Sequence, residues 1–182
     1  MGNPIEARAA FENPGESAPL GTMTVKRRDL YVPGLLPHRG KWALVENLTV
    51  NLDQNTASGT CRVRPSLVFG HFDTVPGVIV TEMIHQAGAA MLLLLLRQQG
   101  KLGTGRAIHT IVSEDGTIKY GRKTAAEPNG TNFEVCMTWH KRPRECFKQR
   151  ITGKLMRNEM PVAALDFEGL AMYADTGDMI RI

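Results

Sequence analysis

The longest apolar run of the chain lies between residues 78 and 99, and it predicts one long helix because good helix formers fill it. At about 1.5 Å per residue, such a helix would be roughly 33 Å long. Glu82, His85 and Gln86 interrupt the run and leave residues 87–96 as its unbroken apolar part. That part is well short of the roughly 20 residues needed to cross a bilayer. A helix that is apolar almost all round is instead expected to be wrapped by other structure.

Shorter segments on both sides of this run have the alternation and composition of strands. Residues 41–50 and 57–63, joined by a turn at 53–55, predict an antiparallel hairpin. Further strands are expected at 107–112, 117–120, 132–140, 145–156 and 161–173, with turns at 128–130 and 157–159. Pro76 suits the start of the long helix, since its missing N–H would have had no partner there.

The order of these elements favours one architecture. No strand–helix repetition is present, so an antiparallel sheet curled around one central helix is expected, which is an α+β hotdog fold. Residues 1–22 are rich in Ala, Pro, Gly and Glu without apolar periodicity, and they are expected to form a loose tail. Residues 23–182 would then form a single domain.

Composition agrees with one soluble globular domain, because 182 residues with 42% hydrophobic and 22% charged content are ordinary for that class. Aromatic residues make up only 6%, and no nucleic-acid-binding signature is present, so neither a nucleic acid nor a membrane is expected as a partner. The net charge of +4 comes from scattered basic groups such as those at 26–28, 122–123 and 141–142. Each group is either a solvated face or a docking rim for an acidic or phosphate-bearing partner.

The three cysteines, Cys61, Cys136 and Cys146, have no metal-ligand spacing and lie in strand-like segments. They are expected to be small core residues in a reducing compartment. The N-terminus has acidic residues and prolines before any apolar run, unlike a secretory signal. A cytoplasmic location is the expectation.

Candidate chemistry gathers around the start of the long helix. His71 lies before a turn, and Glu82 lies one turn into a helix that is otherwise suited to burial, an arrangement that suits proton transfer. The alternatives are that His71 is an ordinary loop residue and that Glu82 simply reaches solvent. The spacing of Glu82 and His85 is also half of a carboxylate metal site, but no second helix supplies partners, so no metal is expected. His85 and Gln86 are expected to orient Glu82 or to line its pocket.

The remaining histidines, His38, His109 and His140, have no partner that the sequence reveals, and they are expected to be structural.

Several ordered motifs resemble the FabZ-type beta-hydroxyacyl-acyl-carrier-protein dehydratases, over about residues 34–173. They are Leu35-Leu36-Pro37-His38-Arg39 with Ala43-Leu44-Val45-Glu46, Gly70-His71-Phe72, Pro76-Gly77-Val78 with Glu82 and Gln86, Ile118-Lys119-Tyr120, and residues 163–172. The chain departs from the family pattern in two loops. The loop between His71 and Pro76 is a few residues shorter, and the stretch 121–132 is longer and lacks the usual Pro-Gly-Asp turn.

The resemblance implies dehydration of 3-hydroxyacyl thioesters to trans-2-enoyl thioesters in fatty-acid or polyketide biosynthesis. By resemblance, His71 is the base, Glu82 is the acid and the backbone N–H of Gly77 stabilises the oxyanion. The same resemblance assigns substrate contacts to Phe72, Val78, Met83, Gln86 and Ala87, with Met91 as a further candidate for the tunnel wall.

The resemblance also implies partners. The substrate would carry phosphopantetheine, bound to acyl carrier protein or present in coenzyme A, and no separate cofactor is expected. A homodimer, or an assembly of dimers, would bring the histidine of one subunit to the acid of the other. Two alternatives stay open: a hotdog acyl thioesterase, in which the carboxylate activates water, and a non-catalytic acyl-binding partner.

Overall fold

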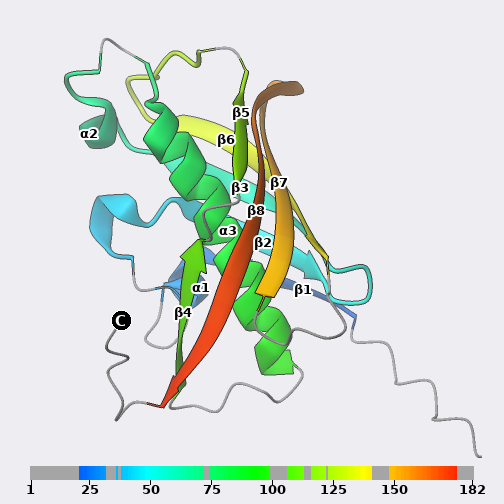
Figure 1. The fold of residues 1–182 in the computed structure, drawn as a ribbon. Helices are drawn as coiled ribbons and strands as arrows, with labels where there is room; N and C mark the ends of the chain where they lie inside the picture. Colours follow the sequence, from blue (N-terminus) through cyan, green and yellow to red (C-terminus); the bar gives the residue numbers. More distant parts are fainter. Residues whose placement is uncertain are drawn as a thin grey trace, which may run out of the picture.

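The computed structural model describes residues 21–31, 36, 38–71, 74–98, 106–112, 116–121, 123–140 and 148–175. Within these residues an antiparallel sheet curls around one long helix, α3 (Gly77–Gln98), as Figure 1 shows. This arrangement confirms the α+β hotdog architecture that the sequence predicts.

The sheet runs in the order β1-β2-β3-β6-β7-β8-β4, and β5 pairs with β8 off this path. Every pairing between these strands is antiparallel. The strands are β1 (Thr22–Lys26), β2 (Val45–Asn51), β3 (Thr56–Val63), β4 (Arg106–Val112), β5 (Thr117–Tyr120), β6 (Thr131–His140), β7 (Lys148–Arg157) and β8 (Met160–Asp175). The β7–β8 hairpin turns at Asn158 and Glu159, whose φ angles of 49° and 62° are those of a tight turn that follows the twist of the strands.

The helix α3 lies in the core because its side chains have apolar neighbours on several strands. It contacts β2, β3, β6, β7 and β8. On β6, alternate residues turn toward it, so that Phe133, Val135, Met137 and Trp139 are buried while their neighbours face outward. The stretch Gly77–Leu94 has the length and hydropathy of a membrane span, but 67% of it is buried inside the protein. The helix is therefore a core helix, as the sequence predicts.

The structure differs from the sequence predictions in several short elements. Strand β1 begins at Thr22, inside the predicted tail, and the helices α1 (Arg27–Leu30) and α2 (Pro65–Val68) were not predicted. A 3₁₀ turn, η1 (Gly40–Trp42), takes the first positions of the expected strand 41–50. These short elements carry no periodicity of their own, since each is a single turn or an edge strand.

The cysteine prediction is correct for Cys61 and wrong for Cys136. Cys61 is fully buried on β3, whereas Cys136 is exposed on β6. The reason is the strand alternation: Cys136 lies between the inward-facing Val135 and Met137, so its own side chain must face away from the helix. Cys146 lies outside the described residues.

Close packing of α3 on the sheet depends on Gly153 of β7. A Cβ atom at this position would overlap the side chains of Ile84 on α3 and Met137 on β6. We predict that Gly153→Ala lowers the free energy of unfolding by about 1–3 kcal/mol, the usual cost of overpacking. Urea unfolding measures this, with Lys154→Ala on the same strand as the control because Lys154 is exposed. An unchanged midpoint for Gly153→Ala would contradict this packing.

Candidate functional site

The first turns of α3 leave one face partly open to solvent. Val78 is 68% exposed, and the side chain of Glu82, one turn further along, is 28% exposed. Thr81 and His85 lie on the same face and are partly exposed. Ile79, Val80, Met83 and Ile84 are buried, so the partly open face and Gly77 are the part of α3 in this region that a ligand can reach within a single chain.

Glu82 is held through one of its two carboxylate oxygens. Its Oε1 lies 2.8 Å from Nε2 of Gln86 and 2.9 Å from Nε2 of His38. No described residue forms a hydrogen bond with Oε2. His38 is thus a partner of the candidate catalytic carboxylate, and the prediction that it is merely structural missed this contact. The motif Leu35-Leu36-Pro37-His38-Arg39 was the available signal, but the sequence does not show that it folds back onto α3.

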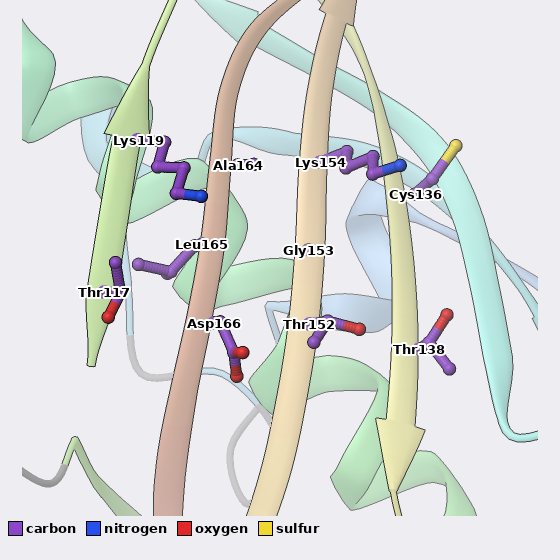
Figure 2. Close-up of a pocket in the computed structure, with 10 residues that line it drawn as sticks. All are labelled: Thr117, Lys119, Cys136, Thr138, Thr152, Gly153, Lys154, Ala164, Leu165 and Asp166. Carbon is purple, nitrogen blue, oxygen red and sulfur yellow. The ribbon is translucent and has the colours of Figure 1, made fainter. Parts of the chain in front are cut away.

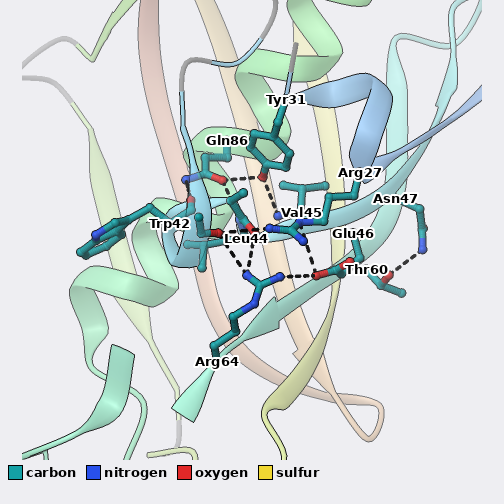
Figure 3. Close-up of polar contacts among 12 residues, drawn as sticks. Arg27, Tyr31, Trp42, Leu44, Val45, Glu46, Asn47, Thr60, Arg64 and Gln86 are labelled. Atoms are coloured by element: carbon teal, nitrogen blue, oxygen red, sulfur yellow. Dashed lines mark hydrogen bonds and ion pairs between the residues drawn. The ribbon is translucent and has the colours of Figure 1, made fainter. Parts of the chain in front are cut away.

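Gln86 is 1% exposed, and all four hydrogen-bonding positions of its amide are used. Figure 3 shows its contacts with Tyr31, Trp42 and Leu44. Its Nε2 donates to the carbonyl oxygen of Trp42 at 2.8 Å and to Glu82. Its Oε1 accepts from the backbone N–H of Leu44 at 3.1 Å and from the hydroxyl of Tyr31 at 2.7 Å. A backbone N–H can only donate and a carbonyl can only accept, so the amide has one possible orientation.

Tyr31 extends this chain of hydrogen bonds to β2. Its hydroxyl oxygen accepts from the backbone N–H of Val45 at 2.7 Å, so its own hydrogen is available to Gln86. Burial raises the pKa of Tyr31 well above the usual value of a phenol, against the smaller opposite effect of the Val45 hydrogen bond. Tyr31 is therefore protonated at neutral pH and acts as a donor here.

Arginines hold the segment that carries His38. Arg39 donates to the carbonyl oxygens of Leu36 and His38, each at 2.9 Å.

Arg27 and Arg64 both donate to the carbonyl oxygen of Gly40, at 3.1 and 3.4 Å. Both also pair with Glu46, at 3.8 and 3.6 Å (Figure 3). Of the predicted basic group at 26–28, Arg27 thus faces the protein, whereas Arg28 is largely exposed.

His71 precedes the loop that leads to α3, and its side chain is exposed. Its backbone is fixed, because its N–H donates to Val68 and its carbonyl oxygen accepts from Thr74. Within the described part of one chain, no contact joins His71 to Glu82. Its role as the base stays a prediction.

Gly77 begins α3, and Tyr120 covers it. A Cβ atom at position 77 would lie 3.1 Å from the Tyr120 ring, whose hydroxyl is 2.9 Å from Oγ1 of Thr81. The first backbone donors to Pro76 are Ile79 and Val80, and no described residue accepts a hydrogen bond from the N–H groups of Gly77 and Val78. These two N–H groups remain candidates for binding a developing negative charge.

The other predicted substrate contacts lie at different depths. Met83, Ala87 and Met91 are buried in the core, while Phe72 lies outside the described residues.

His85 makes an edge-to-face contact with Phe167, with ring centroids 4.9 Å apart. Burial lowers the pKa of His85, and the nearby charge of Glu82 partly offsets this effect. Its Nε2 is buried without a hydrogen-bond partner among the described residues.

One cavity on the described surface lies away from this site, and a second lies beside it. A groove of about 560 Å³ crosses β5, β6, β7 and β8 on the side away from α3, as Figure 2 shows, and Lys119, Cys136, Lys154 and Asp166 line it. A smaller cavity of about 390 Å³ lies beside His38 and is lined by Arg27, Arg28, Tyr31 and Arg39.

Among the described residues, no three His, Cys, Asp or Glu side chains come together as a candidate metal site.

No protein-family model and no curated protein matches the sequence. Solved structures do match. A candidate thioesterase related to phenylacetic acid degradation, from Ralstonia eutropha, is 13% identical, with 66% of this chain and 80% of that chain covered, at a TM-score of 0.50. A candidate esterase from Mycobacterium tuberculosis is 15% identical, with 66% and 86% covered, at 0.49. A hypothetical thioesterase from Streptococcus pneumoniae, solved with coenzyme A, is 11% identical, with 65% and 80% covered, at 0.49.

Likeness at such low identity shows a shared fold. The first of these structures therefore supports the hotdog architecture and leaves the reaction to be argued from the site.

The saturated amide of Gln86 leads to a stability prediction. In Gln86→Met, the buried backbone N–H of Leu44 and the half-buried carbonyl of Trp42 lose their partner. We expect the free energy of unfolding to fall by about 2–4 kcal/mol, since each unpaired buried group costs about 1–3 kcal/mol. Urea unfolding measures the change, and Gln54→Met in the exposed β2–β3 turn is the control. Equal effects of the two substitutions would contradict the network.

Burial of His85 predicts a pH dependence of stability. Because its pKa is lowered in the folded state, the unfolded state takes up a proton first as the pH falls below the ordinary imidazole value of about 6.5. His85 therefore contributes a loss of stability between about pH 7.5 and about pH 5.5. His85→Leu should reduce this loss when unfolding is measured at both values, whereas His140→Ala, at an exposed position, should not. An unchanged slope in His85→Leu would contradict the burial effect.

Proposed function

We propose that this protein is an enzyme that acts on acyl thioesters, and that Glu82 is the general acid or base that transfers the proton in its reaction. The observation that carries this proposal is the geometry of Glu82. Its carboxylate lies on the partly open face of α3, is held through Oε1, and has Oε2 without a partner among the described residues. The N–H groups of Gly77 and Val78 lie about one turn away at the start of the same helix.

Thioester hydrolysis is the reaction that this geometry supports best. The thioester carbonyl oxygen would bind at the N–H groups that begin α3, which stabilise negative charge. Glu82 Oε2 would take a proton from water, whose oxygen attacks the carbonyl carbon. Collapse of the intermediate breaks the C–S bond, and the thiolate receives the proton back from Glu82. The candidate thioesterase that shares the fold makes this the first reaction to test.

Dehydration of a 3-hydroxyacyl thioester is the second candidate. The exposed imidazole of His71, just before the loop to α3, and the dehydratase-like motifs favour it. His71 would remove the proton α to the carbonyl, and protonated Glu82 would give its proton to the departing hydroxyl, which leaves water and an enoyl thioester. The resemblance implies that a second copy of the chain brings these two residues together. In either reaction, the acyl group of the substrate could be carried as a thioester of coenzyme A or of a carrier protein.

The two reactions are separated by supplying a saturated acyl thioester and a 3-hydroxyacyl thioester, each on coenzyme A and on acyl carrier protein. For hydrolysis we expect free thiol from the saturated substrate. Glu82→Gln should lower kcat by about 10²- to 10⁴-fold, the usual contribution of a general base. His71→Ala should leave hydrolysis nearly unchanged, as should His140→Ala, a matched surface control.

Formation of an enoyl thioester that is lost in both His71→Ala and Glu82→Gln would instead establish dehydration. Wild-type protein that turns over none of the substrates would overturn the enzyme proposal and favour a non-catalytic acyl-binding protein. Full activity in Glu82→Gln would overturn the assignment of Glu82.

A further inference from the structure

The contact between His38 and Glu82 is not used by the mechanism above. Nε2 of His38 lies 2.9 Å from Oε1 of Glu82, and both side chains are only partly exposed, at 32% and 28%. Nδ1 of His38 is buried and has no hydrogen-bond partner among the described residues. An imidazole that touches a candidate catalytic carboxylate through one nitrogen, with the other nitrogen unpaired, can have one of two tautomers.

The neighbouring amide decides where the protons lie. Nε2 of Gln86 is a donor because it must supply a hydrogen to the carbonyl oxygen of Trp42, and it also donates to Oε1 of Glu82. In its carboxylate form Glu82 has no hydrogen to donate, so Oε1 can only accept. His38 approaches the same oxygen, so its Nε2 must carry the hydrogen of that contact as well.

The other nitrogen of the imidazole agrees with this assignment. A hydrogen on Nδ1 would point into protein without an acceptor, because that atom is buried and unpaired among the described residues. An unprotonated Nδ1 leaves only a lone pair unmatched, whereas a protonated Nδ1 would leave a buried N–H donor without an acceptor. The Nε2–H tautomer satisfies the contact to Glu82 and avoids a buried N–H without a partner.

We propose that His38 is a positioning residue that acts through Glu82: its Nε2–H, together with Gln86, holds Oε1, so that Oε2 is the oxygen that exchanges a proton with the substrate. This inference rests on the proposed function. Two donors on one oxygen fix the rotation of the carboxylate about its last bond, which a single donor does not. The reactive oxygen is then aimed before the substrate arrives, which is how a site lowers the cost of reaching the transition state.

The backbone around His38 is built to keep this contact. Arg39 binds the carbonyl oxygens of Leu36 and of His38 itself. Arg27 and Arg64 bind the carbonyl oxygen of Gly40. Because these arginines satisfy the carbonyl groups of Leu36, His38 and Gly40, they restrain the backbone from which the imidazole reaches Glu82.

The test compares His38→Gln with His38→Ala under the conditions in which wild-type protein turns over its thioester. The Nε2 of glutamine can occupy the place of the imidazole Nε2 and donate to Oε1, whereas alanine cannot. We expect His38→Ala to lower kcat by about 10- to 100-fold with little change in KM, as for a misplaced catalytic group. His38→Gln should stay within about threefold of wild type. Circular dichroism and urea unfolding of both variants show whether each is folded.

Equal losses of kcat in the folded Gln and Ala variants would overturn the proposal, because the donor would then be irrelevant. A change confined to KM would overturn it too, since it would place His38 in binding.

A second measurement does not depend on activity. The ¹⁵N spectrum of histidine-labelled full-length protein, with the His38 signals identified by their loss in His38→Gln, reports which ring nitrogen carries the proton. The Nε2–H tautomer is expected, and an Nδ1–H tautomer would overturn the proposal. If wild-type protein turns over no thioester, the proposed function fails, and the tautomer alone then decides whether His38 holds Glu82 as inferred.

Discussion

The buried amide of Gln86 is the interaction on which the candidate site depends. An amide inside an apolar helix is costly unless each of its polar atoms is paired. Here four partners pair it, among them the N–H of Leu44, the carbonyl of Trp42 and the hydroxyl of Tyr31. Because the N–H of Leu44 and the carbonyl of Trp42 would lose their partner without Gln86, removing the amide costs more than one hydrogen bond. The network therefore makes the segment around η1, the start of β2 and the helix α3 one unit.

The fourth partner of this amide is Glu82, and through it the structural network becomes part of the candidate chemistry. A carboxylate on a helix otherwise suited to burial would be expected to turn toward solvent. Here Gln86 and His38 bind the same oxygen and keep the carboxylate at the boundary between core and surface. The free-energy cost of orienting the carboxylate falls on folding, so no further cost of this kind arises when a thioester binds. Either hydrolysis or dehydration benefits from this, since both need one carboxylate oxygen directed at the substrate.

The sequence predicts the parts of this fold in which apolar residues recur with the period of a helix or a strand. The long apolar run predicts α3 nearly to its ends, and the alternation of Phe133, Val135 and Met137 predicts β6 and the face it buries. It also contained the information to place Cys136 outside, because that residue occupies the alternate position of the same strand. The single turns α1, η1 and α2 have too few residues for a period. The contact between His38 and Glu82 was missed for another reason: it joins residues far apart in sequence, and neither side chain alone reveals the other.

Gly77 shows how two separate reasons can account for one residue of a motif. The resemblance links this glycine to the approach of a thioester, yet a Cβ atom there would lie 3.1 Å from the ring of Tyr120, which also bonds Thr81. The packing of Tyr120 is therefore a reason for glycine that does not depend on the substrate, because the ring would have to shift by a few tenths of an ångström to admit a Cβ atom. The oxyanion role belongs to the backbone N–H groups of Gly77 and Val78, which any residue except proline would supply. It follows that a substitution at Gly77 tests the packing of Tyr120 first, and that the proton-transfer chemistry is better tested at Glu82, whose Oε2 makes no hydrogen bond among the described residues.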